Sequence, residues 1–323
     1  MRPLQATAPS ATRSPEANPA PLRPAEEPRT NRIAPDPSPV SVVLRACRPR
    51  QWSKNALVLI APAAAGVIGR PLVQAEVAGA FVSFSLLASA TYLFNDVRDR
   101  ERDRRHPRKR HRPIASGKLA PKRAIRVATG LSVLGLALAA LISPALATAG
   151  LGYMALTTSY SIWWRHVVFV DLAAVAGGFV LRAMAGGAAS GVPLSRSFLA
   201  VSAACSLFLV AGKRHAELAD GRPSAGTRTT LSRYSRRSLR LVLAGAAGFS
   251  LAAYAWWAFA RPDPSLWFDL SLLPFILWLA RYGTLLGTGA GEAPEELILR
   301  DRALLACGAA WVLLFMGGVY VAH

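Results

Sequence analysis

The segment Tyr92-Leu-Phe-Asn-Asp-Val-Arg-Asp-Arg-Glu-Arg-Asp103 closes a long apolar run and opens a dense run of charges. An apolar run of roughly 20 residues that ends in charge is typical of a helix that crosses a bilayer. At about 100° per residue, a single helical arc of roughly 100° holds Tyr92, Asn95, Asp96, Asp99 and Asp103. Carboxylate and amide oxygens on one face suit a hard cation such as Mg²⁺, which usually also takes oxygens from a substrate phosphate. The segment therefore predicts a membrane helix with a metal and phosphate site at its end.

The composition extends this interpretation to the whole chain. Of its 323 residues, 52% are hydrophobic, and the formal net charge is +20. A soluble domain this basic is rarely this apolar, so we expect an all-α, polytopic membrane protein. About nine segments approach the roughly 20 apolar residues that cross a bilayer, although the first and sixth are short. They lie near residues 55–69, 74–94, 124–142, 145–163, 167–187, 196–212, 239–260, 266–284 and 303–321.

The basic residues alternate between the connections. They precede the first span and fill the loops at 98–126 and 213–240. The connections near 70–74, 143–145, 188–197 and 261–266, by contrast, carry only Arg70, Arg196 and Arg261. Because positive loops stay in the cytoplasm, this pattern puts the N-terminus inside and the C-terminus outside. An odd number of spans agrees with it, since it puts the two termini on opposite sides. Most of these cations are expected to set topology and to anchor headgroups. Nucleic acid is not expected as a partner, since the cations lie in short loops between spans.

Residues 1–40 differ from the rest of the chain. They hold ten of the 23 prolines and show no apolar periodicity, so we expect a disordered cytoplasmic tail. Residues 41–323 are expected to form one transmembrane catalytic domain, inserted through its first span. The three cysteines have no close spacing and predict neither a metal knuckle nor a disulfide framework.

A strongly basic segment comes directly after the acidic residues. It reads Arg104-Arg105-His106-Pro107-Arg108-Lys109-Arg110-His111-Arg112-Pro113. Such cations bind phosphate oxygens that a metal leaves free. The other interpretation is a solvated cytoplasmic loop, which explains the arginines but not the helical spacing of the acids, so a site is favoured.

Three further sets of polar residues are candidates for ligand binding. Tyr160 to His166 precedes Asp171 and Arg182, which lie in an apolar span, where ionisable residues are usually functional or paired. Lys213 forms either a simple helical pair with Glu217 or, together with Arg214, part of a phosphate pocket. Arg50 and Lys54 precede the first span as interfacial anchors or ligand contacts.

Four blocks make the chain similar to the UbiA superfamily of intramembrane prenyltransferases. They are Arg48-Pro-Arg-Gln-Trp-x-Lys54-Asn55, Asn95-Asp-x-x-Asp-x-x-x-Asp103-Arg-x-His-Pro-x-Lys109-x-x-Arg-Pro113, Tyr160 through Asp171, and Gly212-Lys-Arg-x-Ala-Glu217. They span most of residues 45–220 and resemble most the branch of phosphoribosyltransferases that act on decaprenyl phosphate. The chain departs from the aromatic prenyltransferases in having Val175 where a second aspartate would stand. It departs from the phosphoribosyltransferases in having Arg165 where lysine is common.

The resemblance implies a UbiA-like bundle in a bacterial plasma membrane, with the active site on the cytoplasmic side. The donor would be 5-phosphoribosyl diphosphate (PRPP) with Mg²⁺, and the acceptor a polyprenyl (decaprenyl) phosphate among the membrane lipids. The product would serve the synthesis of lipid-linked arabinose for cell-envelope glycans. A phosphate acceptor is already an anionic nucleophile, so no strong general base is needed, and catalysis would depend on positioning and charge stabilisation. The sequence leaves room for a homo-oligomer.

The resemblance also implies roles for individual residues. Asn95 and Asp99 would be the main Mg²⁺ ligands, supported by Asp96 and Asp103. The donor would be held by Tyr92, Lys54, Arg105 and Lys109. Candidates for the lipid phosphate or the donor 5-phosphate are Tyr160, Arg165, His166, Arg182, Lys213 and Arg214. Asp171 would orient a ribose hydroxyl or stabilise the developing cation.

Two other functions remain as alternatives. The nearer one is a UbiA-type aromatic prenyltransferase with a prenyl diphosphate donor, which the missing second aspartate disfavours. The other is a multi-pass transporter with a cation site, which would place ionisable residues near the middle of the membrane. Most of the ionisable clusters here lie at the expected cytoplasmic edge instead.

Overall fold

Prolines begin several of the helices that carry the fold. Pro71, Pro121 and Pro144 each stand in the first turn of a long helix, where a missing N–H costs nothing and the fixed φ angle already suits the helix. The computed structural model describes residues 38–219, 233–261, 265–287 and 294–321. Within these ranges every regular element is helical. The predicted tail lies outside the described residues up to Pro37, and α1 begins at Pro39.

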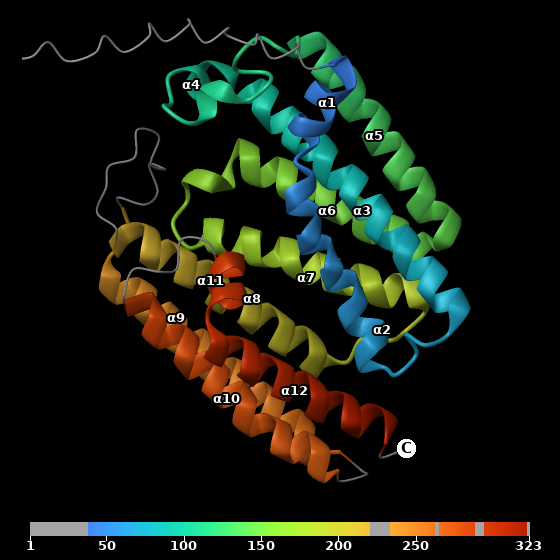
Figure 1. Ribbon diagram of the computed structural model, residues 1–323, viewed down its shortest axis with the longest axis vertical. Coiled ribbons are helices and arrows are strands. Elements are labelled where there is room, and N and C mark those ends of the chain that lie inside the picture. The colour runs from blue at the N-terminus through green and yellow to red at the C-terminus, as the bar shows by residue number, and fades with distance from the viewer. Residues whose placement is uncertain (1–37, 220–232, 262–264, 288–293, 322–323) are drawn as a thin grey trace, which may run out of the picture. The chain divides into compact units, whose positions relative to one another are not determined.

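The elements follow one another in the order shown in Figure 1. They are α1 (Pro39–Cys47), the 3₁₀ helix η1 (Pro49–Leu59), α2 (Ile60–Ala64), α3 (Pro71–Arg98), α4 (Arg100–Arg104), η2 (Lys109–His111), α5 (Pro121–Ile142), α6 (Pro144–Ile162), η3 (Trp164–His166), α7 (Val170–Ser190), α8 (Arg196–Ala219), α9 (Arg236–Phe259), α10 (Leu266–Gly287), α11 (Pro294–Arg300) and α12 (Arg302–Tyr320).

Seven of the described helices are long and apolar enough to cross a membrane: α3, α5, α7, α8, α9, α10 and α12. The chain is therefore a multi-pass membrane protein of the expected all-helical class. Two of the nine predicted spans are not among the seven. The segment predicted at 55–69 is divided between η1 and the short α2, and α6 ends in the polar run Thr157-Thr-Ser-Tyr-Ser161. The count of nine is thus not confirmed.

Helix α7 lies between α3 and α6 on one side and α8 on the other (Figure 1). Small residues allow these helices to approach closely, as is usual in membrane bundles. A Cβ atom on Gly186 of α7 would lie 2.0 Å from the carbonyl oxygen of Val58, so η1 packs directly on the backbone of α7. On α3, Ser83 donates a hydrogen bond of 2.8 Å to the carbonyl of Gly135 in α5. These contacts fix η1, α3, α5 and α7 as one scaffold.

The helix that carries the acidic face is not continuous. Helix α3 ends at Arg98, and Asp99 caps it with φ −88° and ψ 7° before α4 begins. The backbone bonds from Asp99 N to Asn95 O and from Asp103 N to Asp99 O continue the helical pattern across this break. The prediction of one helical face was thus right for the residues up to Arg98, and Asp103 follows on a second, short helix. The loop after α4 folds back, held by a 3.1 Å bond from Arg104 Nε to the carbonyl of Ala115.

Candidate active site

A polar cavity of about 270 Å³ lies at the C-terminal end of α3. Side chains from four parts of the chain meet there: the turn after α1, the end of α3, the α4–η2 region and the segment from the end of α6 through η3. The lining residues are Arg48, Tyr92, Asn95, Asp96, Asp99, Arg102, Lys109, Arg112, Tyr160, Ser161, Arg165 and His166. Eight of the residues predicted from the sequence therefore lie around one cavity.

The cavity has an excess of positive charge. Among its lining residues are five arginines or lysines and only two aspartates. The guanidinium of Arg48 also stands over the ring of Tyr92, with its Cζ 5.0 Å from the ring centre. A concave site with a cationic excess raises the local concentration of anions. The arrangement is thus suited to a ligand that carries several negative charges.

Buried acids hold two of these arginines in place. Asp96, at 4% exposure, accepts hydrogen bonds from Arg48 at 2.5 Å and from Arg112 at 3.1 Å. Arg112 also donates to Asp103 at 2.6 Å. Because each buried carboxylate has a partner, neither leaves an uncompensated charge. Asp96 and Asp103 therefore fix the positions of Arg48 and Arg112 over the cavity.

Asp99 is more accessible and has one arginine partner. Nη1 of Arg165 donates to both of its carboxylate oxygens, at 3.0 and 2.8 Å. Burial alone would raise the pKa of Asp99, but the hydrogen bond and charge of Arg165, with the charges of Arg102 and Arg98, lower that pKa below its usual value. The carboxylate is therefore ionised at neutral pH and available to a cation.

The oxygen donors of this cavity fit Mg²⁺. Asn95 and Asp99 lie one helical turn apart and line the same space, with Asp96 beside them. Among the described residues, no group of three or more His, Cys, Asp or Glu side chains could hold a metal by itself. Mg²⁺ does not need one, since it commonly binds through one or two carboxylates, waters and substrate phosphates. Asn95 and Asp99 are therefore the residues that fit the metal.

Four lining residues were not among the predicted site residues: Arg48, Arg102, Arg112 and Ser161. Arg48 and Arg112 stand inside two of the four blocks that resemble the UbiA superfamily, but their role depends on a contact with Asp96 that spacing alone does not reveal. Conversely, the cavity lining does not include Lys54, Arg105 or Asp103. Arg105 is exposed, Lys54 is half-buried on η1, and Asp103 acts on the cavity through Arg112.

Asp171 belongs to a second polar cluster. It is fully buried, accepts a short hydrogen bond from the hydroxyl of Tyr234, and lies 3.4 Å from Nε of Arg214. The same hydroxyl accepts a 2.7 Å bond from the backbone N–H of Phe169, whose φ is +65°. Burial, followed by the bond to Asp171, raises the pKa of Tyr234. The phenol is thus a neutral donor that fixes the start of α7.

Glu217 completes this second cluster. Its carboxylate binds Arg214 at 2.8 Å, so the predicted helical pair forms with Arg214 rather than with Lys213. Lys213 is half-buried on α8 and does not line the polar cavity. Tyr234 was not predicted from the sequence, since it stands 63 residues from Asp171.

Arg182 lies in a third network, with neutral partners. Nε donates to Asn55 at 2.7 Å, Nη1 to the carbonyl of Gly178 at 2.7 Å, and Nη2 to the hydroxyl of Tyr153 at 2.8 Å. Asn55 in turn donates to Ser85 of α3 at 3.0 Å. Asp171 and Arg182 are therefore both buried on α7, but they bind different partners. Arg182 joins η1, α3, α6 and α7.

Comparisons with known proteins agree with this geometry. Residues 56–299 match the model of the UbiA prenyltransferase family. The chain is 42% identical over 288 residues to a decaprenyl-phosphate phosphoribosyltransferase of Corynebacterium glutamicum, covering 86% of this chain and 87% of that one. It is 43% identical over 279 residues to a protein of the same name from Mycobacterium tuberculosis, covering 84% and 92%.

Solved structures share the fold at lower identity. A UbiA homologue from Archaeoglobus fulgidus bound to GPP and Mg²⁺ superposes with a TM-score of 0.67 at 18% identity, over 87% of this chain and 99% of that one. The family match covers more than half of the chain, and the two relatives align over most of their own length. The chain belongs to the UbiA prenyltransferase family.

Proposed function

We propose that the protein transfers the 5-phosphoribosyl group of PRPP to a polyprenyl phosphate, of which decaprenyl phosphate is the model, and releases diphosphate. The observation that carries the proposal is the cavity at the end of α3, where five basic side chains surround Asn95 and Asp99. The names of the two relatives supply the acceptor and the transferred group. The product would be a lipid-linked precursor of arabinose for cell-envelope glycans.

The reaction forms a bond between ribose C1 and the acceptor phosphate, and it breaks the bond between C1 and the diphosphate. An oxygen of the acceptor phosphate attacks C1 of the ribose, and the bond from C1 to the diphosphate oxygen breaks with its electron pair on the leaving diphosphate. The attacking oxygen is already anionic, so no proton has to be removed. Mg²⁺, held by Asn95 and Asp99, would supply charge neutralisation at the diphosphate.

The side chains of the cavity bind and orient the two anions. Arg48 and Arg112 are suited to the diphosphate, because Asp96 and Asp103 hold them in fixed positions before any ligand binds. Lys109 and Arg165 would contact the remaining phosphate oxygens of the donor or the acceptor. Tyr92 and Tyr160, which line the same cavity, would pack against the ribose or the first isoprene unit.

The second and third clusters support this site. Arg214 and Tyr234 already bind the carboxylate of Asp171. For Asp171 to bind a ribose hydroxyl, one of these two side chains would have to move away. Arg182 holds Asn55, and therefore η1, which follows Arg48 directly. Lys54, Arg105 and Lys213 remain proposed contacts for substrate phosphates at the edge of the site.

We place the cavity on the cytoplasmic side of a bacterial plasma membrane, with the N-terminus inside and the C-terminus outside. The basic loops after α3 and after α8 support this orientation, because positive loops stay in the cytoplasm. A highly charged donor such as PRPP must reach the site from water. The acceptor would enter from the membrane lipids.

The test uses purified protein with labelled PRPP, decaprenyl phosphate and Mg²⁺, and follows the label into the lipid phase. We expect labelling that EDTA abolishes and that added Mg²⁺ restores. A parallel reaction with a prenyl diphosphate and an aromatic acid tests the aromatic prenyltransferase alternative. Transfer only in that second reaction would refute the proposal and leave the family membership unchanged.

A further inference from the structure

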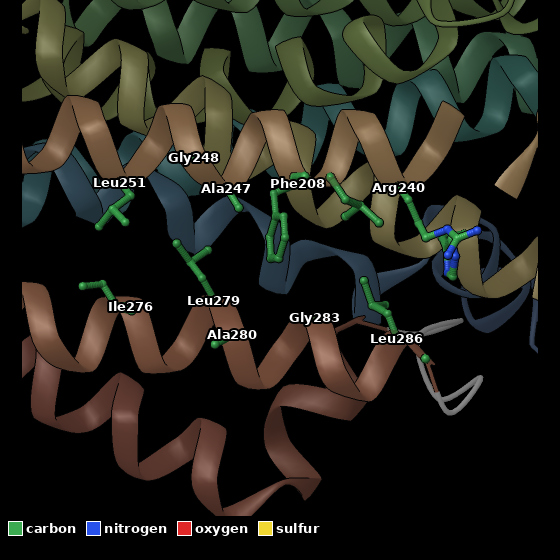
Figure 2. Close-up of a pocket in the computed structure, with 14 residues that line it drawn as sticks. Phe208, Arg240, Ala247, Gly248, Leu251, Ile276, Leu279, Ala280, Gly283 and Leu286 are labelled. Atoms are coloured by element: carbon green, nitrogen blue, oxygen red, sulfur yellow. The ribbon is translucent and has the colours of Figure 1, made fainter. Parts of the chain in front are cut away.

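A second, larger cavity lies away from the polar site, in a groove between α8, α9 and α10. It has a volume of about 560 Å³, within the range of roughly 300–1,000 Å³ that small ligands occupy. Its walls are apolar along most of their length, with Leu251 and Ile276 at one end (Figure 2). At the other end stands Arg240, in Figure 2 beside Leu286, and His215 of α8 also lines the groove. The groove thus combines an apolar channel with a basic end.

Within the part of the chain that the structure describes, no acidic side chain lines the groove. Among the residues that the structure describes, Arg240 forms no ion pair, and Nδ1 of His215 is buried without a hydrogen-bond partner. Arg236 and Arg237 stand in the first turn of α9, one turn before Arg240, and that turn contains no acid. The N-terminal end of a helix favours a negative charge, so basic residues there are placed unfavourably unless an anion binds.

The length of the groove fits one half of a bilayer. From Arg240 to Leu251 along α9, and from Ile276 to Gly287 along α10, each wall runs for twelve residues, or about 17 Å. The hydrocarbon core of a bilayer is roughly 30 Å thick, so the groove matches the depth of one leaflet. A phospholipid acyl chain has this reach, whereas a decaprenyl chain is much longer.

Glycines keep the groove open. A Cβ atom on Gly248 of α9 or on Gly283 of α10 would meet no heavy atom within 4 Å, because both face the empty space. The groove is also separate from the polar clusters. Arg214 of α8 turns to Asp171 on α7, while the next residue, His215, faces the groove.

We propose that this groove binds one anionic glycerophospholipid, with its phosphate on Arg240 and His215 and an acyl chain between α9 and α10. Basic pockets between membrane helices commonly bind acidic headgroups at the membrane surface. The site is independent of the proposed transfer reaction, since it uses none of the residues assigned to it. Its occupant fills a groove between helices and therefore stabilises the packing of α9 and α10.

The experiment compares phosphatidylglycerol with phosphatidylcholine of identical acyl chains, added to purified full-length protein in detergent. Native mass spectrometry counts retained lipids, and thermal unfolding measures their effect. We expect phosphatidylglycerol to bind and to raise Tm more than phosphatidylcholine. Arg240→Gln should weaken phosphatidylglycerol binding about fivefold, the ratio for about 1 kcal/mol per basic residue. Gly283→Leu should fill the groove and abolish the preference.

Matched controls make the test specific. Arg237→Gln removes the same charge from the same helix end, and Gly245→Leu adds the same side chain to α9, but neither residue lines the groove. Gly245→Leu should bind phosphatidylglycerol as the wild type does, and Arg237→Gln should weaken that binding less than Arg240→Gln does, because Arg237 does not line the groove. Phosphoribosyl transfer by Arg240→Gln should stay at the wild-type rate with saturating substrates.

Four results would overturn the proposal. Equal binding of the two phospholipids would show nonspecific solvation, and unchanged binding in both groove variants would place the lipid elsewhere. Displacement of phosphatidylglycerol by equimolar decaprenyl phosphate would identify the groove as an acceptor site. A dimer that dissociates in Gly283→Leu without any change in lipid binding would identify a second copy of the chain as the occupant.

Discussion

Nη1 of Arg165 donates to both carboxylate oxygens of Asp99, at 3.0 and 2.8 Å. The two residues stand 66 positions apart, and their pairing joins η3 to the end of α3. The contact places Asp99, the more accessible acid of the cavity, beside a cation that we propose is released to an incoming phosphate. On donor binding, Asp99 would leave Arg165 and bind the metal, while Arg165 would bind a phosphate of the donor. This exchange of partners would couple donor binding to assembly of the site.

Asp99→Asn should abolish this coupling. The amide keeps the shape of the side chain but loses the charge that binds both a cation and Arg165. We expect turnover to fall on the order of 10²–10³-fold, comparable to the loss of one strong electrostatic contact in a catalytic site. The measurement is Mg²⁺-dependent labelling of the lipid, with a monodisperse elution profile as the control for folding. Wild-type activity in this variant would remove Asp99 from the metal site.

Arg165→Lys should weaken donor binding. Arg165 binds Asp99 through Nη1 and, at the same time, donates from Nε to Nε2 of His166 at 3.1 Å. Lysine keeps the charge, but its single ammonium group cannot make both contacts in this geometry. We expect KM for PRPP to rise about tenfold, the factor for about 1.4 kcal/mol of lost contact. Arg108→Lys, at an exposed position outside the cavity, is the control. An unchanged KM would assign Arg165 to Asp99 alone.

Arg112→Gln should destabilise the fold as well as the site. It leaves Asp103, at 3% exposure, without an ion pair among the described residues, while Asp96 keeps Arg48. Removing one partner of a buried pair costs roughly 3–5 kcal/mol, and the partial exposure of Arg112 places the loss near the lower end. Thermal unfolding in detergent should show a Tm several degrees lower. Arg110→Gln, on the exposed side of η2, should unfold as the wild type does.

Gly186→Ala should prevent η1 from packing on α7. The new Cβ atom would lie 2.0 Å from the carbonyl oxygen of Val58, and a backbone atom cannot move aside as a side chain can. Overpacking costs roughly 1–3 kcal/mol, and we expect the upper end here because the whole segment has to shift. Yield of monodisperse protein and Tm are the readouts. Gly130→Ala has open space around its Cβ atom and should be tolerated; equal behaviour of the two variants would contradict the close approach.

His166 makes the stability of the site depend on pH. Burial, followed by the charges of Arg165, Arg102 and Arg98, lowers the pKa of His166 below its usual value. The folded protein therefore binds this proton less readily than the unfolded chain, and stability falls as the pH drops through about 6.5. His166→Gln should lose less Tm than the wild type between pH 7.5 and 5.5. His111→Gln, an exposed histidine that does not line the cavity, should show the full wild-type loss.

The sequence predicted the helices best where apolar length and local signals agree. The spans expected at 124–142, 266–284 and 303–321 correspond to α5, α10 and α12 within three residues at each end. The span predicted at 55–69 is not confirmed, because no single long helix forms there. There the backbone forms η1, with Asn55 buried against Arg182 and Val58 against Gly186. Composition does not reveal how the backbone of such a segment divides into η1 and α2, because that division depends on its packing against α7.

By itself, the sequence determined the class of protein, the acidic end of α3 and the basic character of the loop that follows. Apolar length, charge and helical spacing act within a few residues, so they can be read along the chain. Only the tertiary structure decided which partner each buried polar side chain binds. Arg48 meets Asp96 across 48 residues, Tyr234 meets Asp171 across 63, and Arg182 meets Asn55 across 127. These pairings depend on how helices pack, because a buried charge takes whichever partner the packing brings within reach.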